Sequence, residues 1–154
     1  MNKKTWEILS SDYLMQNKWL TVRKDHVQLP TSVEMDDYSV LEYPDWVTVI
    51  AITEEGKYVM ELQYRHGIRK ICFELCGGTV EKGEKTLLSA KRELKEETGY
   101  EGGEWTLFTT TAPNPAAMTN ICYTYVAIGV KKVSNQDLEL TEDIEVVEMT
   151  ELEL

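Results

Sequence analysis

The segment GGTVEKGEKTLLSAKRELKEETGY, residues Gly77–Tyr100, carries the strongest structural signal in the chain. A glycine pair opens the segment, and a helical pattern follows from about Glu84. Gly99 comes just after the last helical turn, where glycine commonly ends a helix. Apolar residues recur at helical spacing and predict a stripe that faces a core: Leu87, Ala90 and Leu94. The segment therefore predicts one helix that packs on the rest of the fold.

Three carboxylates lie beside this apolar stripe. Glu93, Glu96 and Glu97 are three and four residues apart, so they share one face of the helix. Like charges at this spacing repel by about 0.2–0.5 kcal/mol per pair, and anions in a last turn oppose the helix dipole. A divalent cation would offset both effects, because clustered carboxylates are the hard oxygen ligands that Mg²⁺ selects. A solvated, charge-rich helix in an acidic protein is the alternative.

The spacing between the glycine pair and these glutamates favours a metal site over a solvated helix. Gly78, Glu84 and residues 92–100 follow the pattern G-x5-E-x7-R-E-U-x-E-E-x-G-U, where U is apolar. This pattern resembles the Nudix box, with Tyr100 in the last apolar position as a mild departure. The chain is thus similar to Nudix hydrolases. The resemblance implies an α/β fold, the Nudix α/β/α sandwich around a mixed β-sheet.

Composition limits the partners that we expect. The 154 residues are enough for a substantial core, and their net charge of −11 argues against nucleic acid or an anionic membrane as a general partner. No apolar run could span a membrane, and the first residues lack the apolar core of a signal peptide. The three cysteines form no paired CxxC motif, which disfavours a disulfide framework and a zinc site. We expect reduced cysteines and a cytoplasmic location.

Strand patterns surround the helix. Residues 6–43 predict short strands and turns, and Pro44 marks a boundary. We therefore divide the chain into a small N-terminal antiparallel β subdomain with a role in dimerisation, residues 1–43, and a Nudix domain, residues 44–154. Further strands, with a hairpin turn at 54–56, are predicted at residues 47–53, 57–65, 73–75, 105–111, 121–130 and 144–149. The family's second helix, which follows the last strand, is expected to be short or missing here.

The resemblance also implies a set of catalytic residues. In the family the box glutamates hold Mg²⁺, with Mn²⁺ as an alternative. Carried over, Glu93 and Glu97 become the principal ligands, Glu96 shares a second ion, and the backbone carbonyl of Gly77 also reaches a metal. Arg92 would orient the carboxylates, and an ordinary ion pair with Glu96 is the alternative description of its role.

A further acid is expected from the loop before the last strand. In the family, the glutamate that activates water comes from a loop after the long strand, and residues 141–146 resemble that loop. Glu142 is the first candidate and Glu139 the second. A solvated loop carboxylate is the alternative for both.

Similarity outside the box points to a branch of the family. Residues 63–65 and 74–78 are similar to the QYR and E-L-P-A-G-G/L patterns of ADP-ribose and ADP-sugar pyrophosphatases. Those enzymes are homodimers that exchange N-terminal strands and stack adenine between aromatic rings. Trp19 and Tyr38 lie where such aromatics would be expected, and Arg65 would contact a phosphate. A core or interface position is the alternative for Trp19, and a plain surface position is the alternative for Arg65.

Two departures affect the choice of substrate. The ELCGG segment contains a cysteine that the family pattern lacks. The family's Pro-Gly loop reads Asn114-Pro115-Ala116-Ala117 here, so its glycine is absent. The leading hypothesis is Mg²⁺-dependent hydrolysis of a nucleoside diphosphate linked to another group, with ADP-ribose or an ADP-sugar giving AMP and a sugar phosphate. The alternatives are a nucleoside triphosphate pyrophosphohydrolase and a non-catalytic Nudix module that senses a nucleotide.

Overall fold

The computed structural model describes residues 4–154, which form two compact units. The first unit contains the chain up to Pro44 together with Ala112–Ile121. The second contains Asp45–Thr111 and Cys122–Leu154.

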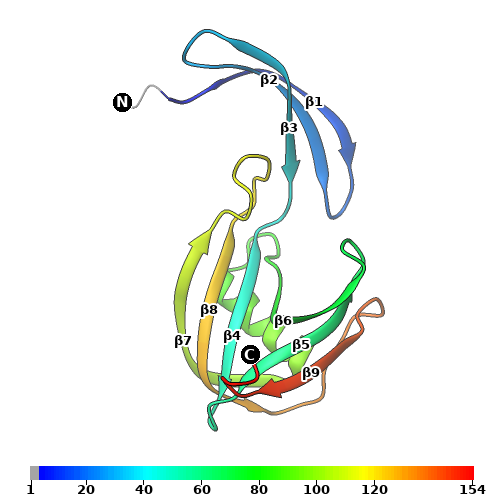
Figure 1. The fold of residues 1–154 in the computed structure, drawn as a ribbon, viewed down its shortest axis with the longest axis vertical. Coiled ribbons are helices and arrows are strands. Elements are labelled where there is room, and N and C mark those ends of the chain that lie inside the picture. Colours follow the sequence, from blue (N-terminus) through cyan, green and yellow to red (C-terminus); the bar gives the residue numbers. More distant parts are fainter. Residues whose placement is uncertain (1–3) are drawn as a thin grey trace. The chain divides into compact units, whose positions relative to one another are not determined.

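The first unit is a three-stranded antiparallel sheet of β1 (Glu7–Gln16), β2 (Thr21–Gln28) and β3 (Glu34–Glu42), in that order (Figure 1). The predicted N-terminal antiparallel sheet is thereby confirmed. The Asn17 side chain closes the first turn, because its Oδ1 accepts hydrogen bonds from the backbone N–H groups of Trp19 and Leu20, at 3.0 and 2.8 Å. The full extent of β1 was not predicted, since this strand is exposed along its whole length and shows no buried face.

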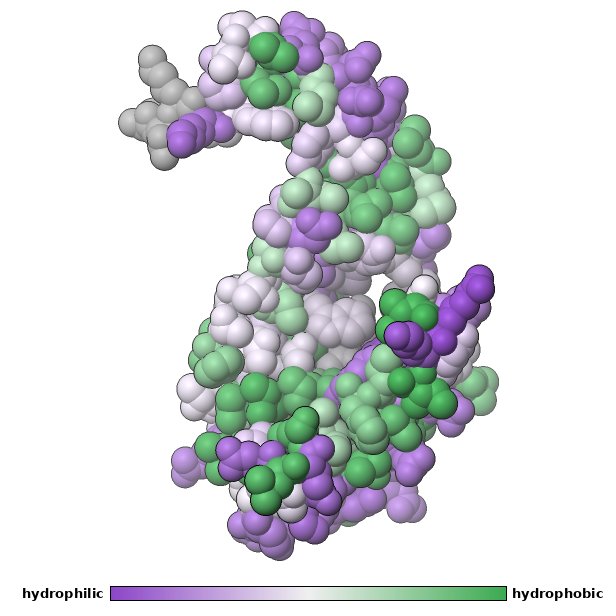
Figure 2. Space-filling model, in the orientation of Figure 1, coloured by the Kyte–Doolittle hydropathy of each residue, from purple (hydrophilic) through white to green (hydrophobic). Residues whose placement is uncertain are grey.

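A polar network occupies the middle of this sheet. Asp25 is buried and accepts hydrogen bonds from Ser11 Oγ at 2.6 Å and from Arg23 Nε at 3.0 Å. In the described part of the unit only two apolar side chains are buried, Val27 and Val40. Many large apolar side chains are instead exposed, and Figure 2 shows hydrophobic patches on the surface of this unit.

The loop 112–121 pairs with the end of β3. The backbone N–H of Leu41 donates to the carbonyl of Ala117 at 2.7 Å, and the N–H of Thr119 donates to the carbonyl of Leu41 at 3.1 Å. A turn forms at Asn114, whose carbonyl accepts the N–H of Met118 at 2.8 Å. This loop therefore groups with the first unit although it connects two strands of the second.

The second unit is built on a six-stranded mixed sheet in the order β7-β8-β4-β6-β5-β9 (Figure 1). Central β4 runs parallel to β8 and antiparallel to β6, which confirms the predicted mixed sheet. The strand bounds are β4 (Trp46–Thr53), β5 (Tyr58–Arg65), β6 (Lys70–Thr79), β7 (Tyr100–Thr111), β8 (Cys122–Lys132) and β9 (Ile144–Met149).

Two strands start several residues earlier than predicted, and one turn is as expected. β7 continues back through Gly102 and Gly103, which have positive φ and look like turn residues in the sequence. β6 begins at Lys70, where its first residues are exposed and carry no pattern of burial. The predicted hairpin between β4 and β5 is confirmed, with Gly56 at a φ of 78°.

One helical segment packs on the sheet and presents the carboxylates. Helix α1 (Thr86–Glu93) begins slightly later than predicted and packs against β4, β6 and β8. It continues as a π-helical segment, η1 (Leu94–Thr98), which Gly99 ends at a left-handed φ of 77°. The predicted apolar stripe is confirmed, since Ala90 and Leu94 are fully buried in the core and Leu87 packs against it.

A short turn follows β9. Residues 150–154 form a turn, in which the N–H of Glu153 donates to the carbonyl of Thr150 at 3.0 Å. Within residues 4–154, no helix is long and apolar enough to cross a membrane.

Candidate active site

The predicted carboxylates lie at the junction of α1 and η1. Glu93 is 9% exposed and Glu97 6% exposed, while Glu96 is only partly buried. The junction is a π-helical turn, a local widening that is frequent at functional sites. The helix therefore buries two negative groups against the sheet. A solvated charged face, the alternative considered above, does not describe Glu93 or Glu97.

Arg92 joins three of the box carboxylates. Its Nη1 donates to Glu93 Oε1 at 2.9 Å and to Glu96 Oε2 at 3.1 Å, and its Nε donates to Glu84 Oε1 at 3.2 Å. The ion pair with Glu96 is thus present as one part of a larger network. Arg92 Nη2 also donates to the carbonyl of Thr79 at 3.2 Å. This geometry fixes the carboxylates relative to the end of β6, which contains the glycine pair.

The Arg92 network does not fully compensate the buried charge. Burial raises the pKa of Glu93 to about 7, against the lowering effect of Arg92, and the charges of Glu97 and Glu96 raise it further. Burial is also the largest cause of the raised pKa of Glu97. Both carboxylates would gain from an additional positive charge at this site.

The glycine pair brings the backbone of β6 against these carboxylates. A Cβ atom on Gly78 would lie 2.3–2.5 Å from the carboxyl atoms of Glu93, and the N–H of Gly77 donates to Glu97 Oε2 at 3.2 Å. A Cβ atom on Gly77 would lie 2.3 Å from the carbonyl oxygen of Val47. Partly uncompensated oxygen donors at a backbone without side chains fit a hard divalent cation.

We expect Gly78→Ala to displace the Glu93 carboxylate rather than to unfold the protein. The new methyl group would overlap the end of a side chain that can rotate, whereas the same change at Gly77 meets backbone. The predicted result is a large loss of turnover, with a loss of about 1–3 kcal/mol in the free energy of unfolding. Steady-state kinetics and denaturant unfolding measure the two effects. Gly67→Ala is the matched control, since nothing lies within 4 Å of its Cβ position, and full activity of Gly78→Ala would contradict the prediction.

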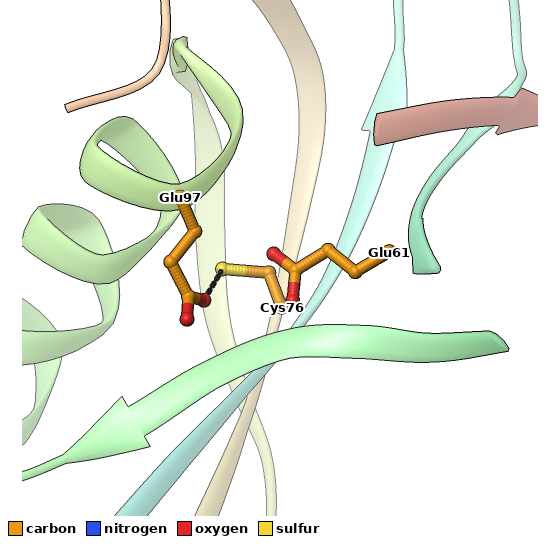
Figure 3. Close-up of side chains that lie close together, drawn as sticks. All are labelled: Glu61, Cys76 and Glu97. Carbon is orange, nitrogen blue, oxygen red and sulfur yellow. Dashed lines mark hydrogen bonds between the residues drawn. The ribbon is translucent and has the colours of Figure 1, made fainter. Parts of the chain in front are cut away.

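Two further buried side chains, Cys76 and Glu61, lie close to Glu97, and this cluster was not predicted (Figure 3). Cys76 is fully buried, as expected for a packed cysteine, and its Sγ donates to Glu97 Oε2 at 3.2 Å. Glu61 of β5 is 1% exposed, and neither of its carboxylate oxygens has a hydrogen-bond partner within residues 4–154. Burial and then the charge of Glu97 raise the pKa of Glu61 to about 8. One sequence feature could have indicated that Glu61 is buried. It lies two residues after Val59 in a strand pattern, and residues two apart in a strand share a face.

The loop that carries Glu142 is tied to the carboxylate segment. Gln136 Nε2 donates to the carbonyl of Glu97 at 2.7 Å and to that of Ile144 at 3.0 Å, and the N–H of Asp137 donates to the carbonyl of Glu96 at 2.8 Å. Sequence reasoning missed Gln136, since nothing local marks an amide that bonds to distant backbone.

Glu142 itself lies at the surface. Its Oε2 accepts the N–H of Glu139 at 2.8 Å, and both residues are exposed. The charge of Glu142 contributes to the raised pKa of Glu97, after larger effects led by burial. The role of Glu142 as water-activating base stays a prediction, as does that of Glu139.

The predicted substrate-binding residues are divided between the two units. Trp19 and Tyr38 belong to the first unit, and Trp19 is 55% exposed. Tyr38 stacks edge-on against Trp6, and its hydroxyl donates to the carbonyl of Ala116. Arg65 belongs to the second unit.

Arg65 makes a two-pronged ion pair with Glu74. Its Nε lies 2.8 Å and its Nη2 2.5 Å from Glu74 Oε2. Glu74 thus orients Arg65, whose side chain is 41% exposed, and its contact with a phosphate stays a prediction.

Comparison with known families agrees with this arrangement. Residues 42–154 match the NUDIX domain, and residues 6–41 match the nucleoside diphosphate sugar hydrolase N-terminal domain. The chain belongs to the Nudix family. The two matches meet within β3, and the NUDIX match contains the Arg92 network, the glycine pair and the Glu142 loop.

Relatives of this Nudix chain cover most of its length. It is 34% identical to the methanol dehydrogenase activator of Bacillus methanolicus and 31% identical to the ADP-ribose pyrophosphatase of Bacillus subtilis. Each match covers 92% of this chain and 77% of the relative. The crystal structure of an ADP compounds hydrolase has a similar fold, with a TM-score of 0.83 at 19% identity over 97% of this chain and 80% of that one. The protein is a Nudix pyrophosphohydrolase.

Proposed function

We propose that this Nudix enzyme hydrolyses ADP-ribose, or a related nucleoside diphosphate sugar, to AMP and a sugar phosphate with Mg²⁺ as cofactor. The observation that carries the proposal is the pair of buried carboxylates, Glu93 and Glu97, next to the glycine pair. Two relatives named ADP-ribose pyrophosphatase, from Bacillus subtilis and Mycobacterium tuberculosis, support the substrate. The match to the nucleoside diphosphate sugar hydrolase N-terminal domain supports the same class.

The proposed magnesium ligands are the carboxylates of Glu93, Glu96 and Glu97 and the carbonyl of Gly77. When bound, Mg²⁺ would neutralise phosphate oxygens and acidify a water molecule. Arg92 holds Glu93 and Glu96 in place through its Nη1 atom, so the oxygen donors need little rearrangement when the substrate arrives. Mn²⁺, whose ligand preferences are similar, is the proposed substitute.

In the proposed reaction, water attacks one phosphorus of the pyrophosphate and the bridging oxygen leaves on the other. Glu142 takes the proton of the attacking water. The hydrogen bonds that Gln136 and Asp137 donate to the carboxylate segment keep the Glu142 loop near the site. Arg65, aligned by Glu74, presents its guanidinium to a phosphate oxygen. The roles proposed for Glu142 and Arg65 rest on the family resemblance, on the hydrogen bonds of the Glu142 loop to the carboxylate segment and on the Arg65–Glu74 ion pair.

Product identification tests the proposal. The pure protein would be incubated with Mg²⁺ and a panel containing ADP-ribose, other nucleoside diphosphate sugars and nucleoside triphosphates. AMP and a sugar phosphate are expected from ADP-ribose, with no inorganic pyrophosphate. Release of pyrophosphate from a triphosphate would favour the alternative enzyme. No nucleoside monophosphate from any diphosphate sugar would overturn the proposal.

We expect Trp19→Ala to raise KM for ADP-ribose about 5- to 150-fold, with kcat nearly unchanged. Trp19 is exposed, and a ring that stacks on a base contributes about 1–3 kcal/mol to binding. Trp19→Phe, which keeps an aromatic face, should show a smaller rise. Steady-state kinetics measure both variants, and an unchanged KM in Trp19→Ala would remove this side chain from the site.

We also propose that the enzyme is a cytoplasmic homodimer. The first unit leaves apolar side chains exposed on its sheet, including Ile8, Tyr13 and Leu14, which supports an interface role. The three cysteines are free, which supports a reducing compartment. Light scattering should give twice the chain mass of 17.7 kDa, and a mass of one chain would contradict the dimer.

A further inference from the structure

Glu61, which is outside the Nudix box, is a buried carboxyl group of the second unit that lacks a hydrogen-bond partner among the described residues. It lies on β5, is 1% exposed, and has no hydrogen-bond partner for either carboxylate oxygen in the described part of the chain. Leaving a buried carboxylate unpaired costs several kcal/mol. A glutamate at this position, where valine or leucine would pack without this cost, points to a partner that binds carboxylates.

The surroundings of Glu61 specify the chemistry of that partner. Figure 3 shows the Glu61 carboxylate directed at Cys76 of β6 and Glu97 of η1. One donor atom from each of the three residues lies within 4.8 Å of the other two. All three side chains are buried. Two carboxylates and a sulfur converge from three separate elements, so their meeting is a product of the fold.

We propose that Glu61, Cys76 and Glu97 form a binding site for a borderline divalent transition metal such as Zn²⁺. Zn²⁺ accepts both cysteine sulfur and carboxylate oxygen, and three protein ligands are a common number for it. Mg²⁺ requires hard oxygen ligands and would not use Cys76. The site shares Glu97 with the proposed magnesium ligands but adds two residues that the box does not contain.

The charges that the three residues carry when deprotonated suit the binding of a divalent cation. With the Cys76 thiol ionised, the site would carry three negative charges, of which Zn²⁺ neutralises two. Arg65, whose charge interacts with Glu61 and Glu97, supplies further positive charge. Binding would replace the Cys76–Glu97 hydrogen bond with two metal–ligand bonds and release the thiol proton to water, together with the Glu61 proton where that carboxyl group is still protonated. The competing account is a proton shared between Glu61 and Glu97 without any metal.

Co²⁺ absorption distinguishes these accounts, because a cobalt–thiolate bond gives a charge-transfer band in the near ultraviolet. The metal-stripped protein would be titrated with Co²⁺ in excess Mg²⁺ and without substrate. We expect saturable binding with this band, and Zn²⁺ should displace the cobalt. Cys76→Ser should remove the band, and Glu61→Gln should weaken Co²⁺ binding at least about tenfold. Cys72→Ser is the matched control and should keep the band, since Cys72 is not one of the three residues.

A second readout covers the possibility that a variant folds poorly. Zn²⁺ should raise the thermal unfolding temperature of the wild-type protein and of Cys72→Ser, but not that of Glu61→Gln. A wild-type protein without the band, or a band that persists in Cys76→Ser, would overturn the proposal. Equal Co²⁺ affinity in wild type and Glu61→Gln would favour the shared proton instead. The site rests on the proposed function only through Glu97, and these measurements need no substrate, so loss of the hydrolysis hypothesis would leave their result unaffected.

Discussion

Glu97→Gln is expected to lower turnover of ADP-ribose by about 10³-fold while substrate binding stays within a few-fold of wild type. Glutamine has nearly the shape of glutamate and can still accept the Gly77 N–H through its amide oxygen. It removes the negative charge that would hold the cation. Metal-ion stabilisation of a transition state supplies several kcal/mol, and each 1.4 kcal/mol changes the rate tenfold. Single-turnover kinetics with saturating substrate measure the loss.

The matched control is Glu104→Gln, an exposed carboxylate on β7. It should keep turnover within about twofold, since surface substitutions away from a site have small effects. This comparison also separates an enzyme from a nucleotide sensor. A sensor would bind ADP-ribose with or without the Glu97 charge and would show no turnover to lose. Glu97→Gln with wild-type turnover would contradict the role assigned to this carboxylate.

Glu61→Gln is expected to stabilise the metal-free protein at pH 8 and to have little effect near pH 5. In the folded protein, burial raises the pKa of Glu61 from 4.5 to about 8. Between these values the folded state keeps a proton that the unfolded chain has released. The contribution of the protonated Glu61 to the free energy of unfolding is therefore fully present below about pH 4.5 and is lost as the pH rises toward 8. Glutamine has no such dependence, so the variant should exceed wild type at pH 8 by about 2–5 kcal/mol.

Denaturant unfolding in EDTA at the two pH values measures this difference. The pKa of Glu93 is raised in the same direction, but this residue remains in both proteins. Because Glu61 and Glu97 influence each other's pKa, the comparison reports the titration of this pair. Glu145→Gln, an exposed position on β9, is the matched control and should change stability by less than about 0.5 kcal/mol at either pH. A stability difference that is the same at pH 5 and pH 8 would show that the Glu61 carboxylate does not titrate in this range.

Local features of the sequence predicted the helix and its charged edge. Ala90 and Leu94 repeat at helical spacing, and Gly99 supplies the left-handed residue that ends the segment. The bounds of β9 were predicted correctly at 144–149, because a polar loop precedes its strand-like residues. The π-helical turn was not predicted, since the same residues fit an ordinary helix equally well.

Contacts between distant strands could not be predicted. Glu61 and Cys76 meet because β5 and β6 pair in one register, in which Met60 lies opposite Leu75, and no residue in the sequence fixes that register. The Gln136 bonds to backbone and the Arg65–Glu74 ion pair depend on tertiary placement in the same way. The family pattern supplied the proposed metal ligands, whereas physical reasoning alone gave only a cluster of repelling carboxylates.

The most direct test of the central claim is ³¹P NMR of ADP-ribose mixed with metal-stripped protein, before and after Mg²⁺ is added. The account predicts that the pyrophosphate signals persist without Mg²⁺. After addition they should be replaced by two monophosphate signals, those of AMP and ribose phosphate, and excess EDTA should stop the conversion. Conversion at the same rate with EDTA from the start, or intact ADP-ribose in the presence of Mg²⁺, would contradict it.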